Sequence, residues 1–275
     1  MVITGIVAVQ TGGAFAATLF DRVGPAGAVV MRLVFAAAIM LLWARPHPSR
    51  WSRADLRTVL GFGATLGVMN LSFYEAVARL PLGAAVTLEV LGPLTVAVAT
   101  GRRWRDAVWA VLAFGGVLLL GGGELSLDPV GVALALTAGA CWGLYILASG
   151  AAGRRFAGPE GLVAAMVVAA LIVVPFGVPQ LLGGTPDLRV VLSGVAVALL
   201  SSVIPYSLEL AALRRLVPAV FGVLMSLEPA VAALAGFLVL GQRLDPVAII
   251  AITLVIAASA GAAVAGRPRR EPNPD

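Results

Sequence analysis

The strongest constraint on this fold is a series of apolar runs, each roughly 20 residues long, that fill almost the whole chain. A helix of that length crosses the roughly 30 Å of hydrocarbon in a bilayer. A soluble domain of 275 residues needs a hydrophilic shell, but 60% of these residues are hydrophobic and only 12% are charged. We therefore expect an all-α membrane protein.

Charged residues, prolines and glycines divide the apolar sequence into ten expected transmembrane helices. The expected spans are residues 2–20, 24–44, 57–78, 82–100, 105–123, 129–149, 160–180, 190–212, 217–240 and 245–265. The connections are too short for a soluble domain, so consecutive helices should run antiparallel. Only the tail, residues 266–275, is expected to be disordered.

The basic residues are all arginines, and they cluster in alternate connections. Fourteen lie on one side of the expected spans and four on the other, with Arg32 inside a span. Positively charged loops stay in the cytoplasm, so both termini are expected there, which an even number of spans allows. The net charge of +5 is thus an orientation signal, and no nucleic-acid partner is expected.

The chain also contains an internal repeat. Arg79–Pro93 matches Arg215–Pro229 without a gap, and Val23–Pro25 matches Ala157–Pro159. Residues 1–123 and 129–265 are therefore expected to be two five-helix repeats, and an odd number of spans inverts the second repeat. Inverted repeats with broken helices are typical of secondary transporters, although a duplication kept for stability alone is the alternative.

Ionisable side chains inside the expected spans are the best markers of a site. Each costs roughly 2.5 kcal/mol or more in hydrocarbon unless it faces protein or water. The five are Arg32, Glu75, Glu89, Glu209 and Glu228.

Glu89 and Glu228 lie in paired segments that each contain a proline, and Glu228 takes the position of Gly92 in the repeat. We expect both carboxylates to face one cavity from opposite halves. The alternative is that both are neutral acids that brace kinked helices.

Arg32 lies about 12 Å into the second span, and Glu89 lies at a similar depth. Such a pair could hold the carboxylate and ammonium groups of an amino acid, or it could neutralise itself as an architectural bridge.

Two glutamates are harder to assign to a site. Glu75 precedes Arg79 by four residues, which predicts a local salt bridge. Glu209 lies one turn after Tyr206, and it either lines the site or reaches to the interface.

The remaining polar and aromatic candidates for substrate binding lie within the spans; they are Gln10, Asn70, Tyr74, Trp142, Tyr145 and Tyr206. A single cysteine and a single histidine offer no metal cluster and no nucleophile with a base, so no cofactor, metal or enzyme activity is expected. Small-residue strings such as Gly63 to Gly67 predict close helix packing, with a homodimer as a further possibility.

Several segments together resemble the drug/metabolite transporter superfamily of the EamA type, and most closely its bacterial threonine/homoserine exporter group. They are Gly67–Asn70, Leu88–Leu94, Gly139–Leu147, Pro205–Glu209 and Phe221–Ala230. The resemblance implies a ten-helix inverted-repeat fold in the bacterial inner (plasma) membrane. It also implies proton-driven efflux of small neutral amino acids, although Glu75 stands where we would expect an uncharged residue.

The expected function is thus a proton-coupled exporter that works by alternating access. Glu89 or Glu228 would bind either a proton or the substrate ammonium, and Arg32 would orient the substrate carboxylate. The alternatives are an efflux carrier for drugs or other metabolites, and a passive scaffold in which the buried charges are dispensable.

Overall fold

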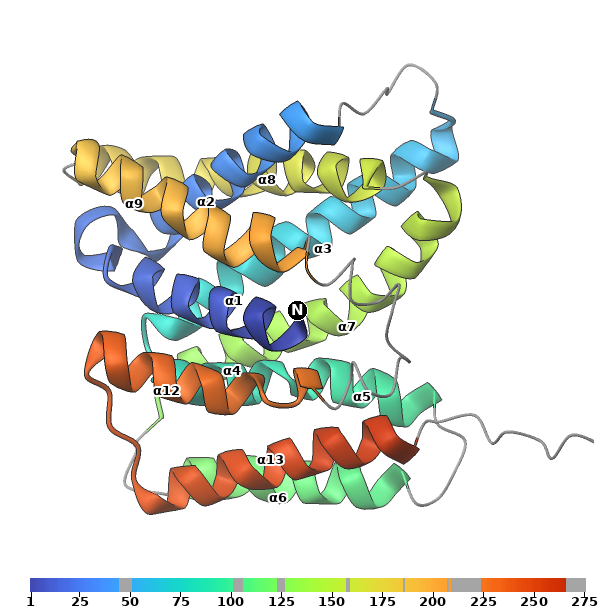
Figure 1. Cartoon of the computed structure of the whole chain (residues 1–275), viewed down its shortest axis with the longest axis vertical. Helices are drawn as coiled ribbons and strands as arrows, with labels where there is room; N and C mark the ends of the chain where they lie inside the picture. The colour runs from blue at the N-terminus through green and yellow to red at the C-terminus, as the bar shows by residue number, and fades with distance from the viewer. Residues whose placement is uncertain are drawn as a thin grey trace, which may run out of the picture.

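The computed structural model describes residues 1–44, 51–100, 106–122, 127–156, 159–184, 186–206, 208 and 224–265, and the regular elements in these ranges are all helices (Figure 1). The first six are α1 (Val2–Ala17), α2 (Phe20–Ala44), α3 (Arg53–Val77), α4 (Leu82–Glu89), α5 (Leu91–Thr100) and α6 (Asp106–Gly122). The others are α7 (Pro129–Arg155), α8 (Glu160–Gly183), α9 (Leu188–Ala198), the π-helical turn η2 (Leu199–Val203), α12 (Glu228–Leu240) and α13 (Pro246–Ala265).

Each of the ten expected spans contains a described helix, and five are long and apolar enough to cross a membrane. Those five are Phe20–Trp43, Pro129–Arg155, Glu160–Gly183, Leu188–Tyr206 and Pro246–Val264. The expectation of an all-helical membrane protein is confirmed at this level. The expected disordered tail lies outside the described residues.

The boundaries differ from the expected ones where local chemistry intervenes. The span expected over 82–100 is two helices: α4 ends at Glu89 and α5 begins at Leu91. The interruption lies just before Pro93, which cannot donate a helical hydrogen bond. The span expected at 190 begins at Leu188, where the Asp187 side chain accepts a hydrogen bond from the Val190 backbone N–H and caps α9.

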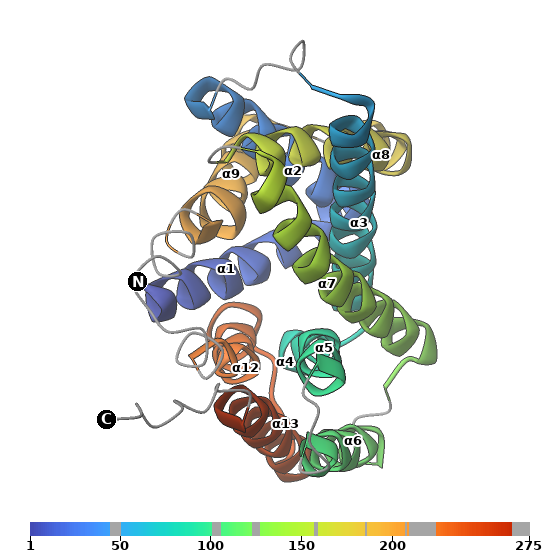
Figure 2. The ribbon, with the colours of Figure 1, turned by 90° about the vertical axis from the view of Figure 1, so that its right-hand side faces the viewer.

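The helices pack as a bundle in which distant parts of the chain lie side by side. α2 packs against α8, α3 against α7 and α8, α4 against α12, and α6 against α13. α1 packs against α12, α9 and η2, and Figure 2 shows this arrangement from the right-hand side of Figure 1.

Small residues permit the closest of these approaches. A Cβ atom at Gly63 would lie 2.6 Å from the Ala165 carbonyl oxygen, and one at Gly67 would lie 3.3 Å from Ala169 Cα. The small residues of α3 therefore allow close packing against α8 of the same chain. A homodimer stays a prediction.

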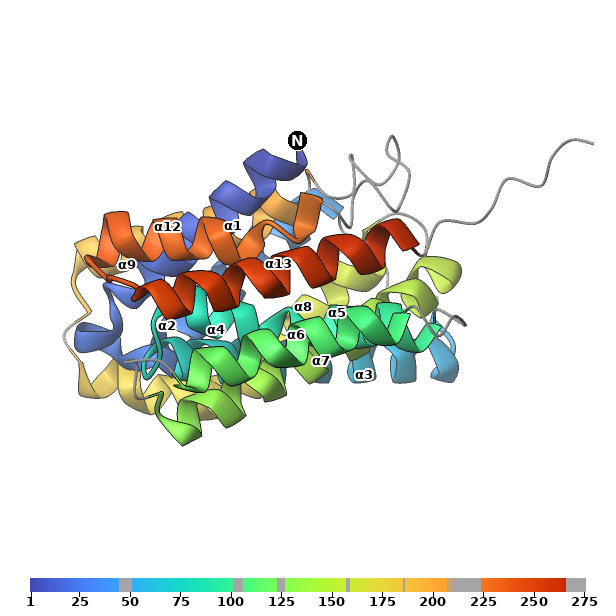
Figure 3. The same ribbon diagram turned by 90° about the horizontal axis from the view of Figure 1, so that it is seen from below.

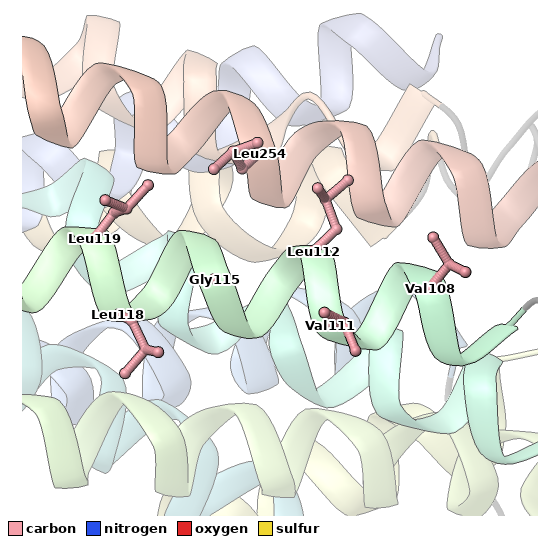
Figure 4. A pocket seen from close by; sticks show the side chains of 7 residues that line it. All are labelled: Val108, Val111, Leu112, Gly115, Leu118, Leu119 and Leu254. Atoms are coloured by element: carbon pink, nitrogen blue, oxygen red, sulfur yellow. The ribbon is translucent and has the colours of Figure 1, made fainter.

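The outer face of the α6–α13 pair is apolar, as expected for a surface in contact with lipid. α13 and α6 lie along one edge of the bundle, as Figure 3 shows from below. The side chains that border the shallow groove on this edge are all apolar (Figure 4), and two of them, Val111 and Leu118, are 70% and 60% exposed.

One end of the bundle carries several polar contacts between helices that are distant in sequence. After Gly24, whose φ of 69° favours glycine, the N–H groups of Ala26 and Gly27 donate to Gln180 Oε1 of α8 at 2.9 and 3.3 Å. The first N–H groups of a helix lack intrahelical partners, so this side chain satisfies two of them.

Two similar contacts occur at the same end. The Leu82 N–H at the start of α4 donates to Gln242 Oε1 at 3.0 Å, and Arg22 pairs with Asp187 at 3.0 Å. We call the end of the bundle that carries the contacts of Gln180 and Gln242 and the Arg22–Asp187 pair the latched end. The predicted local salt bridge between Glu75 and Arg79, at 2.8 Å, is confirmed.

Candidate functional site

A chamber of about 720 Å³ lies inside the bundle, between residues of both halves of the chain. It is lined by eight of the nine side chains that the sequence selects as substrate-binding: Gln10, Arg32, Asn70, Glu89, Trp142, Tyr145, Tyr206 and Glu228. The ninth, Tyr74, is only 1% exposed and does not line the chamber. Glu209 lies outside the described residues.

The chamber extends toward the end of the bundle opposite the latched end. Its lining reaches Trp43 at the end of α2, Phe156 after α7 and Gly161 at the start of α8. On α2 the lining begins only at Arg32, and on α7 only at Trp142. This end faces the viewer in Figure 2, and we call it the open end.

Arg32 is held in place by three hydrogen bonds and is only 7% exposed. Its Nε donates to Ser202 Oγ at 3.1 Å, its Nη1 to Tyr74 Oη at 3.3 Å and its Nη2 to the Ser201 carbonyl oxygen at 2.8 Å. The guanidinium carbon also lies 5.5 Å from the centre of the Tyr74 ring, in a cation–π contact. Tyr74 therefore positions the Arg32 side chain and does not itself line the chamber.

Glu89, the last residue of α4, is half-buried and lines the chamber. Within the described ranges, Glu89 and Arg32 form no ion pair closer than 4.0 Å. The bridge that the sequence offered as an alternative is therefore not seen in this part of the chain. Both groups stay accessible to a third molecule.

Glu228 is the first residue of α12, is 5% exposed and lines the same chamber. The positive end of the helix dipole favours a carboxylate at this position. The structure thus brings the two carboxylates, Glu89 and Glu228, to one chamber from opposite halves. Their role in proton coupling stays a prediction.

Other groups complete the lining. Asn70 donates through Nδ2 to the Leu66 carbonyl oxygen at 2.8 Å, which leaves its Oδ1 as an acceptor. Gln10 is 6% exposed, and the rings of Tyr145 and Phe62 lie 5.2 Å apart. The chamber is thus an aromatic and apolar space with a few convergent polar groups, which is typical of a small-molecule site.

The sequence did not point to Ser201 or to its neighbour Ser202. Both are buried, at 2% and 0% exposure, on the π-helical turn that meets Arg32. The only available signal was a pair of serines within an otherwise apolar run.

Five helices long and apolar enough to cross a membrane, packed with shorter apolar helices around a chamber that has a few charged groups, define a multi-pass membrane protein with a small-molecule site. The chain belongs to the EamA-like transporter family, whose sequence pattern matches residues 129–264. It is 40% identical over 270 residues to the threonine/homoserine exporter RhtA of Escherichia coli (strain K12), covering 97% of this chain and 91% of that protein. It is 41% identical over 267 residues to the exporter of the same name from Salmonella typhimurium (strain SL1344), covering 96% and 90%.

A solved crystal structure has the same fold, with a TM-score of 0.64 over 96% of each chain at 20% identity. The resemblance to the EamA type and its exporter group is thus confirmed, as is the expectation of a transporter and not an enzyme. The expected location in a bacterial inner membrane agrees with these bacterial exporters and with the five long apolar helices.

Proposed function

We propose that this protein exports small neutral amino acids of the threonine or homoserine type by proton antiport with alternating access. The observation that carries the proposal is one chamber in which a guanidinium and a carboxylate, those of Arg32 and Glu89, do not pair with each other. The printed names of the bacterial relatives support the substrate class.

An amino acid carries charges that complement these groups. Its carboxylate suits Arg32, because a guanidinium has five N–H donors and the described residues accept from three of them. Its ammonium suits the Glu89 carboxylate and the Asn70 Oδ1 acceptor. The chamber of about 720 Å³ lies within the range of small-molecule sites.

Proton coupling would follow from competition at a carboxylate. Glu89 or Glu228 binds either a proton or the substrate ammonium, so that the arrival of one displaces the other. Both line the chamber and therefore face the same solute. Desolvated carboxyl groups inside membrane proteins are a recurrent element of proton relays.

The inverted five-helix repeats, residues 1–123 and 129–265, remain part of this proposal. The packing supports them: exchange of α1 with α7 and of α3 with α9 maps the α3–α7 contact onto the contact between α9 and α1. Under the same exchange α2–α8, α4–α12 and α6–α13 map onto themselves.

The two ends of the bundle support alternating access. The open end carries the arginine-rich starts and ends of helices, such as Arg53, Arg154 and Arg155, which favours a cytoplasmic location for it and for both termini. The latched end would then face the periplasm, and this conformation would accept its solute from the cytoplasm.

Replacement of Glu89 by glutamine tests the coupling. In proteoliposomes, Glu89→Gln should abolish threonine transport driven by a pH gradient while the purified protein keeps its melting temperature. Glu75→Gln is the matched control, because Glu75 is also a carboxylate within a span but is paired with Arg79 and does not line the chamber. Gradient-driven transport that survives in Glu89→Gln would refute the role of Glu89.

A carrier of drugs or other metabolites is the second candidate, because aromatic side chains such as Trp142, Tyr145 and Tyr206 line the chamber. A counterflow panel of natural amino acids and aromatic cations distinguishes the two. Exchange of aromatic cations without exchange of threonine or homoserine would favour this candidate.

A further inference from the structure

Several hydroxyl groups on the described helices bond to their own helix. Those of Thr65, Thr87, Thr95, Thr137 and Thr253 each donate to the carbonyl oxygen four residues earlier, at 2.6 to 2.9 Å. This back-bond is the ordinary way for a hydroxyl to be satisfied within a membrane.

Ser201 departs from this pattern. Its side chain is 2% exposed and borders the chamber, but among the described residues its Oγ has no hydrogen-bond partner, as is also the case for Ser259 Oγ of α13. A buried hydroxyl without a partner costs about 1–3 kcal/mol, so its persistence requires an explanation.

The backbone around Ser201 accounts for the lost back-bond. Residues 199–203 form a π-helical turn, in which carbonyl oxygens are displaced from the positions they take in an α-helix. The Ser201 carbonyl oxygen accepts from Arg32 Nη2, and the adjacent Ser202 Oγ accepts from Arg32 Nε. The turn thus supplies two acceptors to the arginine, and the Ser201 hydroxyl of the same turn has no hydrogen-bond partner among the described residues.

Space for this hydroxyl is provided by a glycine on α1. A Cβ atom at Gly12 would collide with Ser201 Oγ and would lie 2.9 Å from Leu200 Cβ. The residues on either side of Gly12 in the lining, Gln10 and Gly13, border the chamber as well. The hydroxyl therefore lies where α1, η2 and the chamber meet.

We propose that Arg32 and the π-helical turn form a carboxylate subsite in which the Ser201 hydroxyl is a specificity-determining donor. The inference rests on the proposed function, since it assigns one end of an amino-acid ligand. The remaining N–H donors of Arg32 favour an anionic ligand group, and an anion accepts hydrogen bonds. Ser201 then donates to one carboxylate oxygen while Arg32 donates to the other, and ligand binding satisfies the hydroxyl.

The test compares a carboxylate ligand with its amide. Purified protein in nanodiscs is titrated with L-threonine and with L-threoninamide, which keeps the ammonium and the side-chain hydroxyl but lacks the negative charge. Wild type should prefer threonine, and Ser201→Ala should lower this preference about tenfold or more, as expected for a hydrogen bond to a charged group.

The matched control is Ser193→Ala, which makes the same substitution on α9, eight residues earlier and outside the chamber lining. It should leave the threonine-to-threoninamide preference at the wild-type value. An unchanged preference in Ser201→Ala would overturn the proposal while leaving the proposed function intact. If wild type binds neither threonine nor homoserine, the proposed function is refuted, and the carboxylate subsite, which depends on it, is refuted as well.

Stability without ligand gives a second readout. Since Ser201→Ala removes an unsatisfied polar group, the ligand-free variant should melt at or above the wild-type temperature. If Ser201 instead stabilised the fold, Ser201→Ala would lower the melting temperature. A fall of several degrees in the melting temperature of the ligand-free variant would contradict the proposal.

Discussion

Gly139→Ala is the sharpest test of how the chamber wall is built. Gly139 of α7 faces the C-terminal end of α4, and a Cβ atom there would lie 2.6 Å from the Glu89 carbonyl oxygen and 3.2 Å from Glu89 Cα. Ordinary contact begins near 3.4 Å, so the two backbones must separate by close to an ångström. Backbone atoms cannot rotate away, and the added carbon therefore displaces Glu89 itself.

Two opposing effects set the magnitude. Alanine stabilises a helix interior by about 1 kcal/mol relative to glycine, whereas overpacking costs about 1–3 kcal/mol, with a rigid backbone contact at the upper end. We expect a net destabilisation of about 1–2 kcal/mol for Gly139→Ala. The rate of threonine counterflow should fall by more than this loss of stability alone would cause. The reason is that Glu89 is displaced by close to an ångström, which weakens its contact with a charged solute.

Gly61→Ala is the matched control. Gly61 lies on α3 with nothing within 4 Å of an added Cβ atom, so only the helix preference changes and the melting temperature should rise slightly. The assay is thermal unfolding of the purified variants in detergent, followed by size-exclusion chromatography, with threonine counterflow on the same preparations. Equal melting temperatures for the two variants would refute the backbone-contact argument.

Two further predictions concern the latched end. Gln180→Leu leaves the N–H groups of Ala26 and Gly27 without their acceptor and should destabilise the protein by about 1–3 kcal/mol, measured by thermal unfolding; an unchanged melting temperature would show that these N–H groups find other partners. The Val190 N–H and then Arg22 hold the pKa of Asp187 below its ordinary value, so its contribution to stability is present above about pH 4 and is lost as the pH falls further. The difference in melting temperature between wild type and Asp187→Asn should therefore be constant from pH 7 to 5 and shrink below pH 4, and a difference that titrates near pH 6 would contradict this assignment.

The sequence predicted the spans well, because a bilayer imposes one length and one polarity on every crossing. It also selected the chamber residues with net charge, Arg32, Glu89 and Glu228, since charged groups are too costly to leave in lipid. The breaks within helices were less predictable. Pro93 indicated a disruption, but the break lies before it, and the π-helical turn at 199–203 has no sequence signature.

Depth within the site was not predictable either. Tyr74 lies four residues after Asn70, so periodicity places both on one face, yet Asn70 lines the chamber while Tyr74 is buried behind Arg32. Ser201 was not predicted as a site residue, because a hydroxyl in an apolar helix usually bonds to the backbone of its own helix. Which hydroxyl loses that bond depends on the backbone shape, and a residue pattern does not contain this information.

The contacts at the latched end have a consequence for the energy of a conformational cycle. Two of the three link a glutamine side chain to N–H groups at the beginning of a helix, and the third is an ion pair whose side chains are 40% and 49% exposed. Water forms hydrogen bonds of nearly equal strength with all of these groups, so parting the helices there would substitute one set of partners for another at a net cost of about 0.5–1.5 kcal/mol per bond. These exchangeable bonds therefore add little to the free energy needed to part the helices at this end.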